Sequence, residues 1–252
     1  MNKIVFITGA TAGFGAACAR KFAANQYDVI ITGRRLERLE QLAAELAAQY
    51  NIDVLPLHFD VRNRDAVLGS INTLPGKWKK IDVLINNAGL AAGKDDFDKA
   101  GLDDWDTMVD TNLKGFAYVA QAVSQLMVPH KRGHIINLGS TAAKYVYAQG
   151  NMYCATKHAV DALSHAMRID LLPYHIKVTA IHPGAADTEF SMVRFKGDRI
   201  AADKVYEGLI PLAAADVAET IFYCTTLPDH VCINDLVITC TQQADSFYSV
   251  KN

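Results

Sequence analysis

Three side chains in the middle of the chain have the types and spacing needed for acid–base chemistry. Tyr153 precedes Lys157 by four residues, so on a helix the two would lie one turn apart on the same face. A tyrosine normally titrates near ~10 and is a poor proton donor or acceptor at neutral pH. A positive charge about 5 Å away would lower that pKa by about two units at an effective dielectric of about 20. We therefore expect Lys157 to make Tyr153 a usable general acid or base.

Ser140 supplies the third group. It precedes Tyr153 by 13 residues and directly follows residues 133–139, which read as a buried strand that would deliver Ser140 to the same place. The alternative is an ordinary amphipathic helix that carries a chance tyrosine and lysine, because Tyr-x-x-x-Lys is a very short pattern.

The elements that must position these residues alternate along the chain. The strands are continuous β-branched runs without apolar–polar alternation, which is typical of a parallel sheet covered on both faces. The sequence therefore predicts one α/β domain over residues 1–252, a doubly wound Rossmann-type fold with about seven parallel strands and helices on both faces. Strands are expected at 4–7, 29–31, 54–57, 83–85, 133–139, 177–181 and 236–238, and helices from about 14, 35–50, 64–74, 102–127, 151 and 216.

Composition excludes several classes of protein. The 252 residues carry a net charge of −2 without a basic stripe, so we expect no nucleic-acid partner. The longest apolar runs are too short to span a membrane, and residues 1–3 lead directly into a strand without a signal segment, so we expect a cytoplasmic protein. Five cysteines without a Cys-x-x-Cys pair indicate reduced, buried thiols.

A glycine-rich turn is expected between the first strand and the first helix. One glycine would permit the tight turn, another would let a pyrophosphate approach the backbone, and the third would let the helix pack closely. The spacing is Gly-x-x-x-Gly-x-Gly, and such turns also occur for steric reasons alone. The candidate cofactor-binding residues of this turn are Gly9, Thr11, Gly13, Phe14 and Gly15.

The end of the second strand should discriminate between the two nicotinamide dinucleotides. A carboxylate there would accept from the ribose 2′-hydroxyl of NAD, but this chain has Arg34 and Arg35, which suit the 2′-phosphate of NADP. The alternative is that these arginines and Arg38 are the solvated start of a helix.

Two further segments fall at carboxyl ends of strands, where the cofactor crevice is expected. Asp60 and Val61 follow the third strand, and Asn87, Ala88 and Gly89 follow the fourth. The small residues leave room for a flat ring and its ribose. Asn87 could equally be a turn residue that holds its own backbone.

These residues together resemble the short-chain dehydrogenase/reductase family over nearly the whole length. The resemblance rests on residues 8–15, 86–89, Asn112, Ser140, Tyr153, Lys157, Pro183, Gly184 and Thr188 in the family's order and spacing. More narrowly, residues 33–35, 104–105, 133–137, 188–198 and 230–234 are similar to the NADP-dependent 3-hydroxy acid dehydrogenases, which oxidise serine, allo-threonine and related acids.

The resemblance implies roles for the matching residues. Tyr153 would exchange the proton with the substrate while hydride passes to or from the nicotinamide, and Lys157 would lower its pKa and hold the ribose. Ser140 would hydrogen-bond the reacting oxygen. Asn112 would disturb the long helix locally and fix a water that links Lys157 to solvent; otherwise it is simply an exposed or self-satisfied asparagine.

Further expectations follow from the same resemblance. Pro183 and Gly184 would lie beside the nicotinamide carboxamide and Thr188 near the phosphates, and the family commonly forms homo-tetramers through its long helices. The subgroup pattern is broken at five positions, where this chain has Val146, Gln149, Cys154, His182 and Cys232. The pocket shape is therefore expected to differ.

Substrate choice should come from the looser region at about 185–213, whose length and composition suit a lid. Within it, Arg194 is the candidate for binding a substrate carboxylate through its planar guanidinium, although arginines in such segments are often only solvated. The expected substrate is a small 3-hydroxy acid or 3-oxo acid such as serine, allo-threonine or 3-hydroxyisobutyrate.

Other interpretations remain open. The same chemistry could act on a pteridine, a sugar or an acyl thioester, and the fold also supports a non-catalytic NADP-binding regulator. His158, Asp161 and His165 share one helix face, but such a set arises on any polar helix surface, so we expect no metal site.

Overall fold

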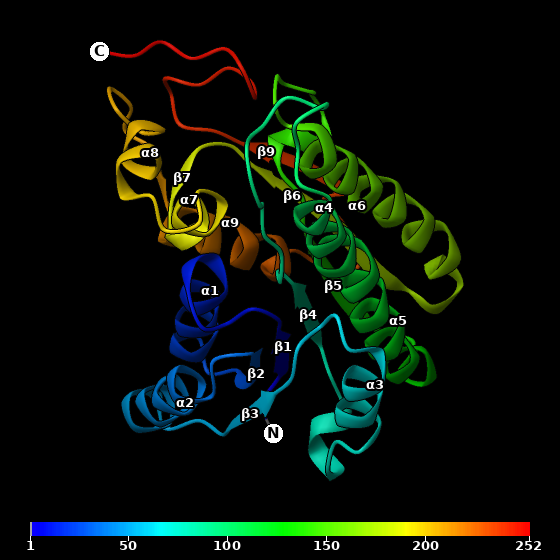
Figure 1. Ribbon diagram of the computed structural model, residues 1–252. Coiled ribbons are helices and arrows are strands. Elements are labelled where there is room, and N and C mark those ends of the chain that lie inside the picture. Colours follow the sequence, from blue (N-terminus) through cyan, green and yellow to red (C-terminus); the bar gives the residue numbers. More distant parts are fainter. Residues whose placement is uncertain (1) are drawn as a thin grey trace.

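The computed structural model describes residues 2–252 and contains a seven-stranded parallel sheet (Figure 1). The strand order is β3-β2-β1-β4-β5-β6-β9, so the direction of winding reverses between β1 and β4. At such a reversal the loops on either side diverge and leave a crevice at the carboxyl ends of the strands. The strands are β1 (Ile4–Ile7), β2 (Asp28–Gly33), β3 (Val54–His58), β4 (Val83–Asn86), β5 (Gly133–Leu138), β6 (Ile176–Pro183) and β9 (Asp235–Ile238).

Helices cover both faces of this sheet, which confirms the predicted fold class. One face packs against α1 (Gly13–Ala24), α2 (Leu36–Tyr50) and α9 (Ala214–Thr226). The other packs against α3 (Arg64–Asn72), α5 (Phe116–Met127) and α6 (Asn151–Asp170), with α4 (Leu102–Val109) leading into α5 (Figure 1).

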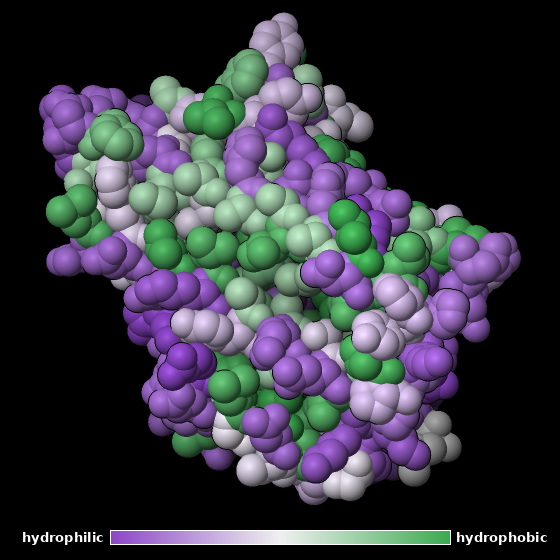
Figure 2. Space-filling view, turned by 90° about the vertical axis from the view of Figure 1, so that its right-hand side faces the viewer, coloured by the Kyte–Doolittle hydropathy of each residue, from purple (hydrophilic) through white to green (hydrophobic). Residues whose placement is uncertain are grey.

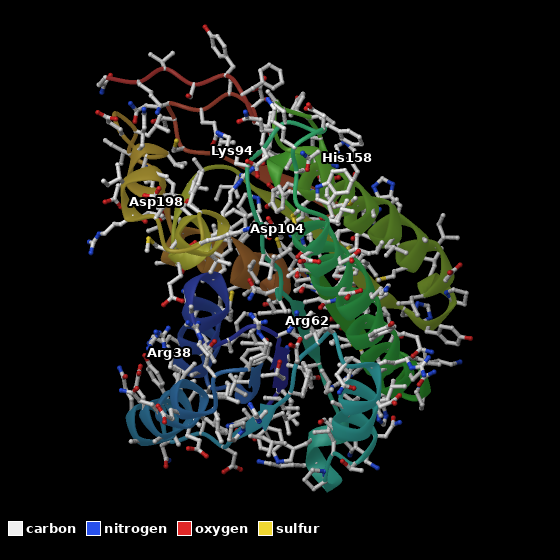
Figure 3. The ribbon with its side chains drawn as sticks, in the orientation of Figure 1. Arg38, Arg62, Lys94, Asp104, His158 and Asp198 are labelled. Carbon is white, nitrogen blue, oxygen red and sulfur yellow. The ribbon has the colours of Figure 1, made fainter. Side chains whose placement is uncertain are left out.

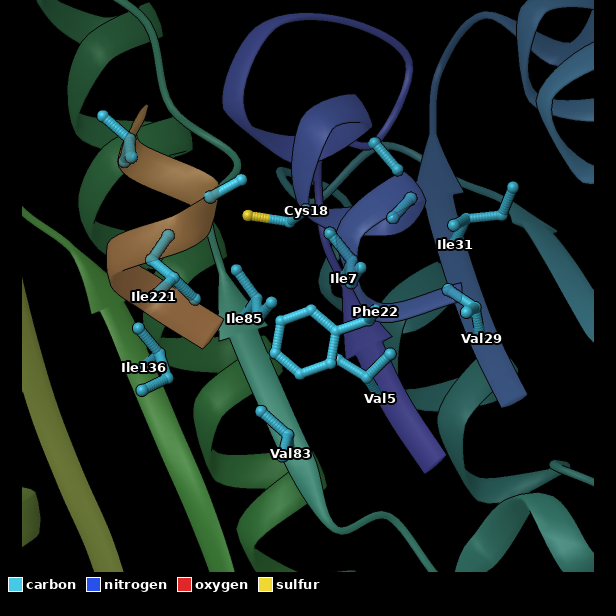
Figure 4. Packing of buried hydrophobic residues seen from close by; sticks show 14 of the residues in the cluster. Val5, Ile7, Cys18, Phe22, Val29, Ile31, Val83, Ile85, Ile136 and Ile221 are labelled. Atoms are coloured by element: carbon cyan, nitrogen blue, oxygen red, sulfur yellow. The ribbon is translucent and has the colours of Figure 1, made fainter. Parts of the chain in front are cut away.

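The larger apolar cluster fixes α1 and α9 against the sheet. Phe22 of α1 is fully buried among residues that include Val5 and Val83, and Cys18 lies on the same helix, facing α9 (Figure 4). A fully buried side chain of this size contributes about 1.5–3 kcal/mol by leaving water. Because α1 is anchored in this way, its first turn is held rigidly over the ends of the central strands.

The region predicted to be loose contains short elements. Two helices, α7 (Glu189–Arg194) and α8 (Arg199–Lys204), lie between β7 (Ala186–Asp187) and β8 (Leu212–Ala213), which pair with each other. They lie at the carboxyl edge of the sheet, with the end of the chain beside α8 (Figure 1).

Two negative expectations concern the membrane and the thiols. Within residues 2–252, no helix combines the length and the hydrophobicity needed to cross a membrane. All five cysteines are free; Cys18, Cys154, Cys224 and Cys240 are buried and Cys232 is half-buried.

Candidate active site

The glycine turn has the geometry that its spacing predicts. Gly9 and Gly13 have φ values of +65° and +51°, in the left-handed region that favours glycine. A Cβ atom at Gly15 would lie 2.3 Å from the carbonyl oxygen of Gly9, so only glycine lets α1 begin this close to the turn. Gly15 therefore serves packing, whereas Gly9 and Gly13 face the crevice.

The crevice is a cavity of about 310 Å³ that joins the glycine turn to the centre of the sheet edge. Glycine and alanine backbone at one wall and arginines at one end suit a dinucleotide with its phosphates, so the residues present fit NADP(H). Thirteen of the predicted cofactor residues line it: Gly9, Thr11, Gly13, Phe14, Arg34, Arg35, Asp60, Val61, Asn87, Ala88, Gly89, Lys157 and Thr188.

Four predicted cofactor residues, Gly15, Tyr153, Pro183 and Gly184, are not part of this lining, and neither are most of the residues predicted to do chemistry. Gly15 packs α1, and a Cβ atom at Gly184 would lie 2.1 Å from Gln243 Oε1 of the C-terminal segment. The residues that do not line the cavity are Gly15, Pro183, Gly184, Asn112, Ser140, Tyr153 and Arg194. A direct contact of Pro183 and Gly184 with the cofactor stays a prediction.

Asn87 combines both of the roles considered for it. Its Nδ2 donates to the carbonyl oxygens of Thr8 at 2.8 Å and Gly9 at 3.3 Å, so it fixes the glycine turn, and it also lines the cavity. The Thr8 hydroxyl accepts from the backbone N–H groups of Asn87 and Ala88, both at 2.9 Å. The turns after β1 and β4 are therefore cross-linked at the point where the winding reverses.

Arg35, which follows β2, and Arg38 of α2 share a carboxylate partner that the sequence did not reveal. Glu189, the first residue of α7, accepts from Arg35 at 2.8 Å and from Arg38 at 2.7 Å. Arg35 also donates to Thr11 Oγ1 at 3.1 Å. The end of β2 itself carries no carboxylate, and this one comes from Glu189, which lies 154 residues further along the chain than Arg35.

Asn112 disturbs the long helix as expected. The helix predicted over 102–127 is interrupted by a π-helical segment, Asp110–Gly115, between α4 and α5. The wider turn lets the side chain of Asn112 bond the backbone of Leu90, accepting from its N–H at 2.8 Å and donating to its carbonyl oxygen at 2.7 Å. Asn112 Nδ2 also lies 3.2 Å from Thr156 Oγ1, so it ties the loop after β4 to α6.

Lys157 is buried on α6 and points at the strand ends. Its Nζ donates to the carbonyl oxygen of Leu138 at 2.8 Å, and a Cβ atom on Gly89 would lie 3.6 Å from Nζ. Burial lowers the pKa of Lys157 to about 8, because an ammonium removed from water is destabilised. Lys157 can therefore release and rebind a proton near neutral pH.

Tyr153 lies beside Lys157, but its pKa moves in the opposite direction from our expectation. Burial raises the pKa of the phenol well above its ordinary value, and the Ser140 hydroxyl and the Arg194 guanidinium only partly oppose this. Lys157 Nζ is 6.0 Å from the centroid of the Tyr153 ring and is bonded to Leu138 instead. The predicted lowering by Lys157 is wrong for the protein alone, because desolvation outweighs a charge that faces elsewhere.

Ser140 is held with its hydroxyl proton free to donate. Its Oγ accepts from the N–H of Ala142 at 3.1 Å, where the turn Thr141–Ala143 begins. The Ser140 hydroxyl lowers the pKa of Tyr153, which places the two hydroxyls together as predicted.

Arg194 of α7 lies against the ring of Tyr153. Its guanidinium carbon is 5.6 Å from the centroid of the Tyr153 ring, and its Nη1 donates to the Tyr147 hydroxyl at 3.0 Å. The Nε of Arg194 is buried and has no hydrogen-bond partner among the described residues. Phe190 packs on the Tyr153 ring at 5.5 Å between centroids, so the phenol lies in an aromatic and cationic enclosure.

The helix face considered for metal binding gives a different set. Ligand atoms of Asp161, His165 and Asp235 lie within 4.8 Å of one another, but Lys144 Nζ already pairs with both carboxylates. His158 instead binds the Cys154 carbonyl oxygen and lies on the outer side of α6 (Figure 3).

Sequence reasoning missed several residues of the site. Glu189, Phe190 and Leu138 line the cavity, and Tyr147 binds Arg194. Leu138 was detectable as the residue two positions before Ser140 at the end of the strand. Phe190 and Tyr147 could not be found from the spacing of residues along the chain, because their partners, Tyr153 and Arg194, lie on separate elements.

Comparisons with known proteins agree with this geometry. Residues 3–199 match the short chain dehydrogenase family. The chain is 48% identical over 248 residues to an NADP-dependent 3-hydroxy acid dehydrogenase of Salmonella typhi, covering 98% of each chain. It is 43% identical over 251 residues to sulfoacetaldehyde reductase 2 of Chromohalobacter salexigens, covering 99% of each.

A solved structure shares the whole fold. The closed form of serine dehydrogenase complexed with NADP+ superimposes with a TM-score of 0.91 at 46% identity, covering 99% of both chains. The fold that carries Tyr153, Lys157, Ser140 and Asn112 in this chain is therefore the fold of that structure. The protein belongs to the short-chain dehydrogenase family.

Proposed function

We propose that this protein is an NADP-dependent oxidoreductase that interconverts a small 3-hydroxy acid and the corresponding 3-oxo acid. One observation carries the proposal: a single cavity joins the glycine turn and the Arg34–Arg35 pair at one end to Lys157 at the other. A dinucleotide bound along this cavity, with its phosphates at the glycine turn, would have its nicotinamide end next to the acid–base side chains. The relatives named above support both the cofactor and the substrate class.

The chain's own residues would divide the work in the following way. When bound, NADP(H) supplies or accepts the hydride. Ser140 donates a hydrogen bond to the reacting oxygen, and Tyr153 transfers the proton at that oxygen. Lys157 holds the cofactor ribose and, with its pKa near 8, can pass a proton onward.

Asn112 has a positioning role in this proposal. Its side chain makes two hydrogen bonds to the backbone of Leu90 and one to the Thr156 hydroxyl, so it holds α6 against the loop after β4. A water held in this region would link Lys157 to solvent.

The acid group of the substrate would bind Arg194. The guanidinium faces Tyr153 and has a buried Nε without a partner in residues 2–252, so a planar carboxylate could take up that donor. We assign residues 185–213 as the lid of a single domain, because α7 in this segment carries both Arg194 and Glu189.

A second candidate substrate is a sulfonate-bearing aldehyde. The observation that favours it is the 43% identity to a sulfoacetaldehyde reductase over nearly the whole of both chains. A sulfonate presents the same negative charge to Arg194 as a carboxylate. Its three oxygens surround a tetrahedral sulfur, however, whereas the two oxygens of a carboxylate lie in one plane with their carbon.

Initial rates with L-serine, L-allo-threonine and 3-hydroxyisobutyrate, each with NADP and with NAD, test the proposal, and sulfoacetaldehyde reduction tests the second candidate. Turnover of a hydroxy acid that is faster with NADP is the expected result. Activity only with neutral sugars, pteridines or acyl thioesters would contradict the substrate class, and no turnover with any substrate would support a non-catalytic binder.

Replacing Arg194 by Met should raise the KM for hydroxy acids by about 10- to 100-fold, because a charge-assisted bidentate contact contributes about 1.5–3 kcal/mol. Neutral alcohols serve as the control, and their KM should change little. An equal change for acids and neutral alcohols would dispose of the assignment.

We also propose that the protein forms a homo-tetramer through its long helices and works in the cytoplasm. Figure 2 shows hydrophobic residues gathered across the face that carries α5 and α6. On α6, Ala155, Ala162, Ala166 and Ile169 are exposed along one side, which suits close helix packing. The proposed cytoplasmic location is supported by the five free cysteines, because thiols stay reduced in that compartment. Light scattering after gel filtration tests the assembly, and a monomer at micromolar concentration would contradict it.

A further inference from the structure

The phenol of Tyr147 holds the guanidinium of Arg194. Nη1 of Arg194 lies 3.0 Å from the Tyr147 hydroxyl, and a guanidinium has no acceptor, so Nη1 donates and the hydroxyl accepts. The guanidinium carbon also lies 5.5 Å from the centroid of the Tyr147 ring and 5.6 Å from that of the Tyr153 ring. The guanidinium therefore lies beside both phenols, and its Nη1 is committed to Tyr147.

The ring of Tyr147 is itself fixed by packing. A Cβ atom at Gly150 would lie 2.7 Å from Cε2 of the Tyr147 ring, so the ring fits because residue 150 has no side chain. The N–H of Gly150 donates to the Tyr147 carbonyl oxygen at 3.0 Å, in the turn that leads into α6. Burial raises the pKa of Tyr147, so its hydroxyl is a neutral acceptor at neutral pH. Tyr147 is thus a rigid support for Arg194.

The backbone around Arg194 is held as well. The Arg194 carbonyl oxygen accepts from the N–H of Gly93 at 3.0 Å, which ties the end of α7 to the loop after β4. Lys196, two residues further on, pairs with Asp104 of α4 at 2.8 Å. The backbone of Arg194 and its Nη1 are therefore fixed by different parts of the chain, which gives the rest of the guanidinium a defined direction.

The other edge of the guanidinium, formed by Nε and Nη2, suits an acid group. Nε of Arg194 is buried and has no hydrogen-bond partner within residues 2–252, which costs free energy that an acceptor bound there would recover. The same edge binds a carboxylate elsewhere in this chain: Arg20 donates from Nε at 2.7 Å and from Nη2 at 2.9 Å to the two oxygens of Glu45. A planar acid group can bind Arg194 in the same way.

We propose that Tyr147 is a positioning residue that makes the site selective for substrates with an acid group. By taking Nη1, it directs the Nε–Nη2 edge of Arg194 toward the acid group of a substrate whose reacting oxygen lies at Ser140 and Tyr153. This role rests on the proposed function, in which Arg194 binds that acid group. Without the Tyr147 hydroxyl the positive charge stays but its direction is lost, so acids bind more weakly while the chemical step is unchanged.

Tyr147→Phe removes the hydroxyl and keeps the ring. It should raise the KM for 3-hydroxy acids roughly 3- to 10-fold and leave kcat within about twofold of wild type, because one hydrogen bond to a charged group is lost. The KM for neutral alcohols should change less than about twofold. Tyr145→Phe is the matched control, since Tyr145 lies in the same loop but is exposed and packs on Phe247. An equal rise for acids and neutral alcohols, or an unchanged KM for acids, would overturn the proposal.

A double variant tests whether the effect of Tyr147 acts through Arg194. In the Arg194→Met protein, adding Tyr147→Phe should change the KM for hydroxy acids less than about twofold, because the guanidinium that Tyr147 positions is already absent. A further rise as large as that caused by Tyr147→Phe in the wild-type protein would show that Tyr147 acts independently of Arg194, which contradicts a positioning role.

Nuclear magnetic resonance of nitrogen-labelled arginine tests the contact without any substrate. The signals missing in Arg194→Met identify the side chain. The bond to Tyr147 should slow rotation about the Nε–Cζ bond, so Nη1 and Nη2 of Arg194 should give separate signals in wild type and merged signals in Tyr147→Phe. Identical signals in both proteins would refute the positioning of Arg194 by Tyr147. If no hydroxy acid is turned over, the proposed function fails, and this resonance result alone decides whether Tyr147 positions Arg194.

Discussion

Burial controls the two central ionisable groups of the site and pushes both toward their neutral forms. It raises the pKa of Tyr153 and lowers that of Lys157 to about 8. Each group is therefore harder to charge than the same side chain in water, and Lys157 Nζ bonds the Leu138 carbonyl oxygen rather than the phenol. The sequence placed these residues together correctly, but spacing alone carries no information about desolvation, which is why the direction for Tyr153 was wrong.

Because the pKa of Lys157 is lowered by folding, the difference in unfolding free energy between wild type and Lys157→Met should depend on pH. The ordinary value is 10.5 and the folded value about 8, so between them the unfolded chain binds more protons and the stability of the fold rises with pH. Wild type should therefore gain roughly 1 to 2 kcal/mol relative to Lys157→Met between about pH 7.5 and pH 9.5.

Urea unfolding of both proteins across this pH range measures that gain. Below about pH 7.5 the two stabilities should run parallel with pH, since Lys157 is then charged in both states. Parallel curves over the whole range would show that the folded pKa is not lowered.

Among the elements, the interrupted helix α4–α5 is the one that organises the site. Its π-helical segment turns Asn112 inward, where it bonds the buried backbone of Leu90. Replacing Asn112 by Ala should lower the free energy of unfolding by about 2–4 kcal/mol, because both backbone groups of Leu90 would lose their partner. Denaturant unfolding checks this.

Thr156→Val is the control for that substitution. It removes only the contact of the Thr156 hydroxyl with Asn112 and the hydrogen bond from that hydroxyl to the backbone carbonyl oxygen of Tyr153, and leaves Leu90 paired. A loss as large as that of Asn112→Ala would mean that the Leu90 bonds are not the main contribution.

A contact between elements links α7 to the start of α2. Glu189 bonds Arg35 and Arg38 and lines the same cavity as Arg35. Its carboxylate would therefore compete with the 2′-phosphate of NADPH for the Arg35 guanidinium. Replacing Glu189 by Gln should tighten NADPH binding about two- to fivefold, since partly exposed ion pairs contribute under about 1 kcal/mol. Fluorescence titration measures this.

NADH serves as the comparison for Glu189→Gln, because it has no phosphate to gain. Equal tightening of both cofactors would indicate a general opening of the cavity rather than competition for the arginines. A contact of this kind cannot be predicted from local patterns, because Glu189 reaches α2 only through the fold.

At the scale of the whole molecule, much of the fold could be predicted. All seven predicted strands occur in the sheet, because buried parallel strands are continuous apolar runs and stand out in the sequence. The short pair β7 and β8 was not predicted, since two-residue strands leave no periodic signal. Most of the crevice lining was predicted because its residues follow the strands directly. The residues of α7 were only partly predicted, because that segment depends on tertiary contacts.

The five thiols differ in burial, so the rate at which each one reacts with a reagent measures how often the structure around it opens. Burial raises the pKa of Cys18 to about 12 and that of Cys224 to about 11, so neither supplies the reactive thiolate while folded, whereas Cys232 is half-buried. An alkylating reagent should label Cys232 first and the other four only as fast as the structure opens, which mass spectrometry would record. Rapid labelling of Cys18 in native buffer would show that α1 detaches from the sheet on its own.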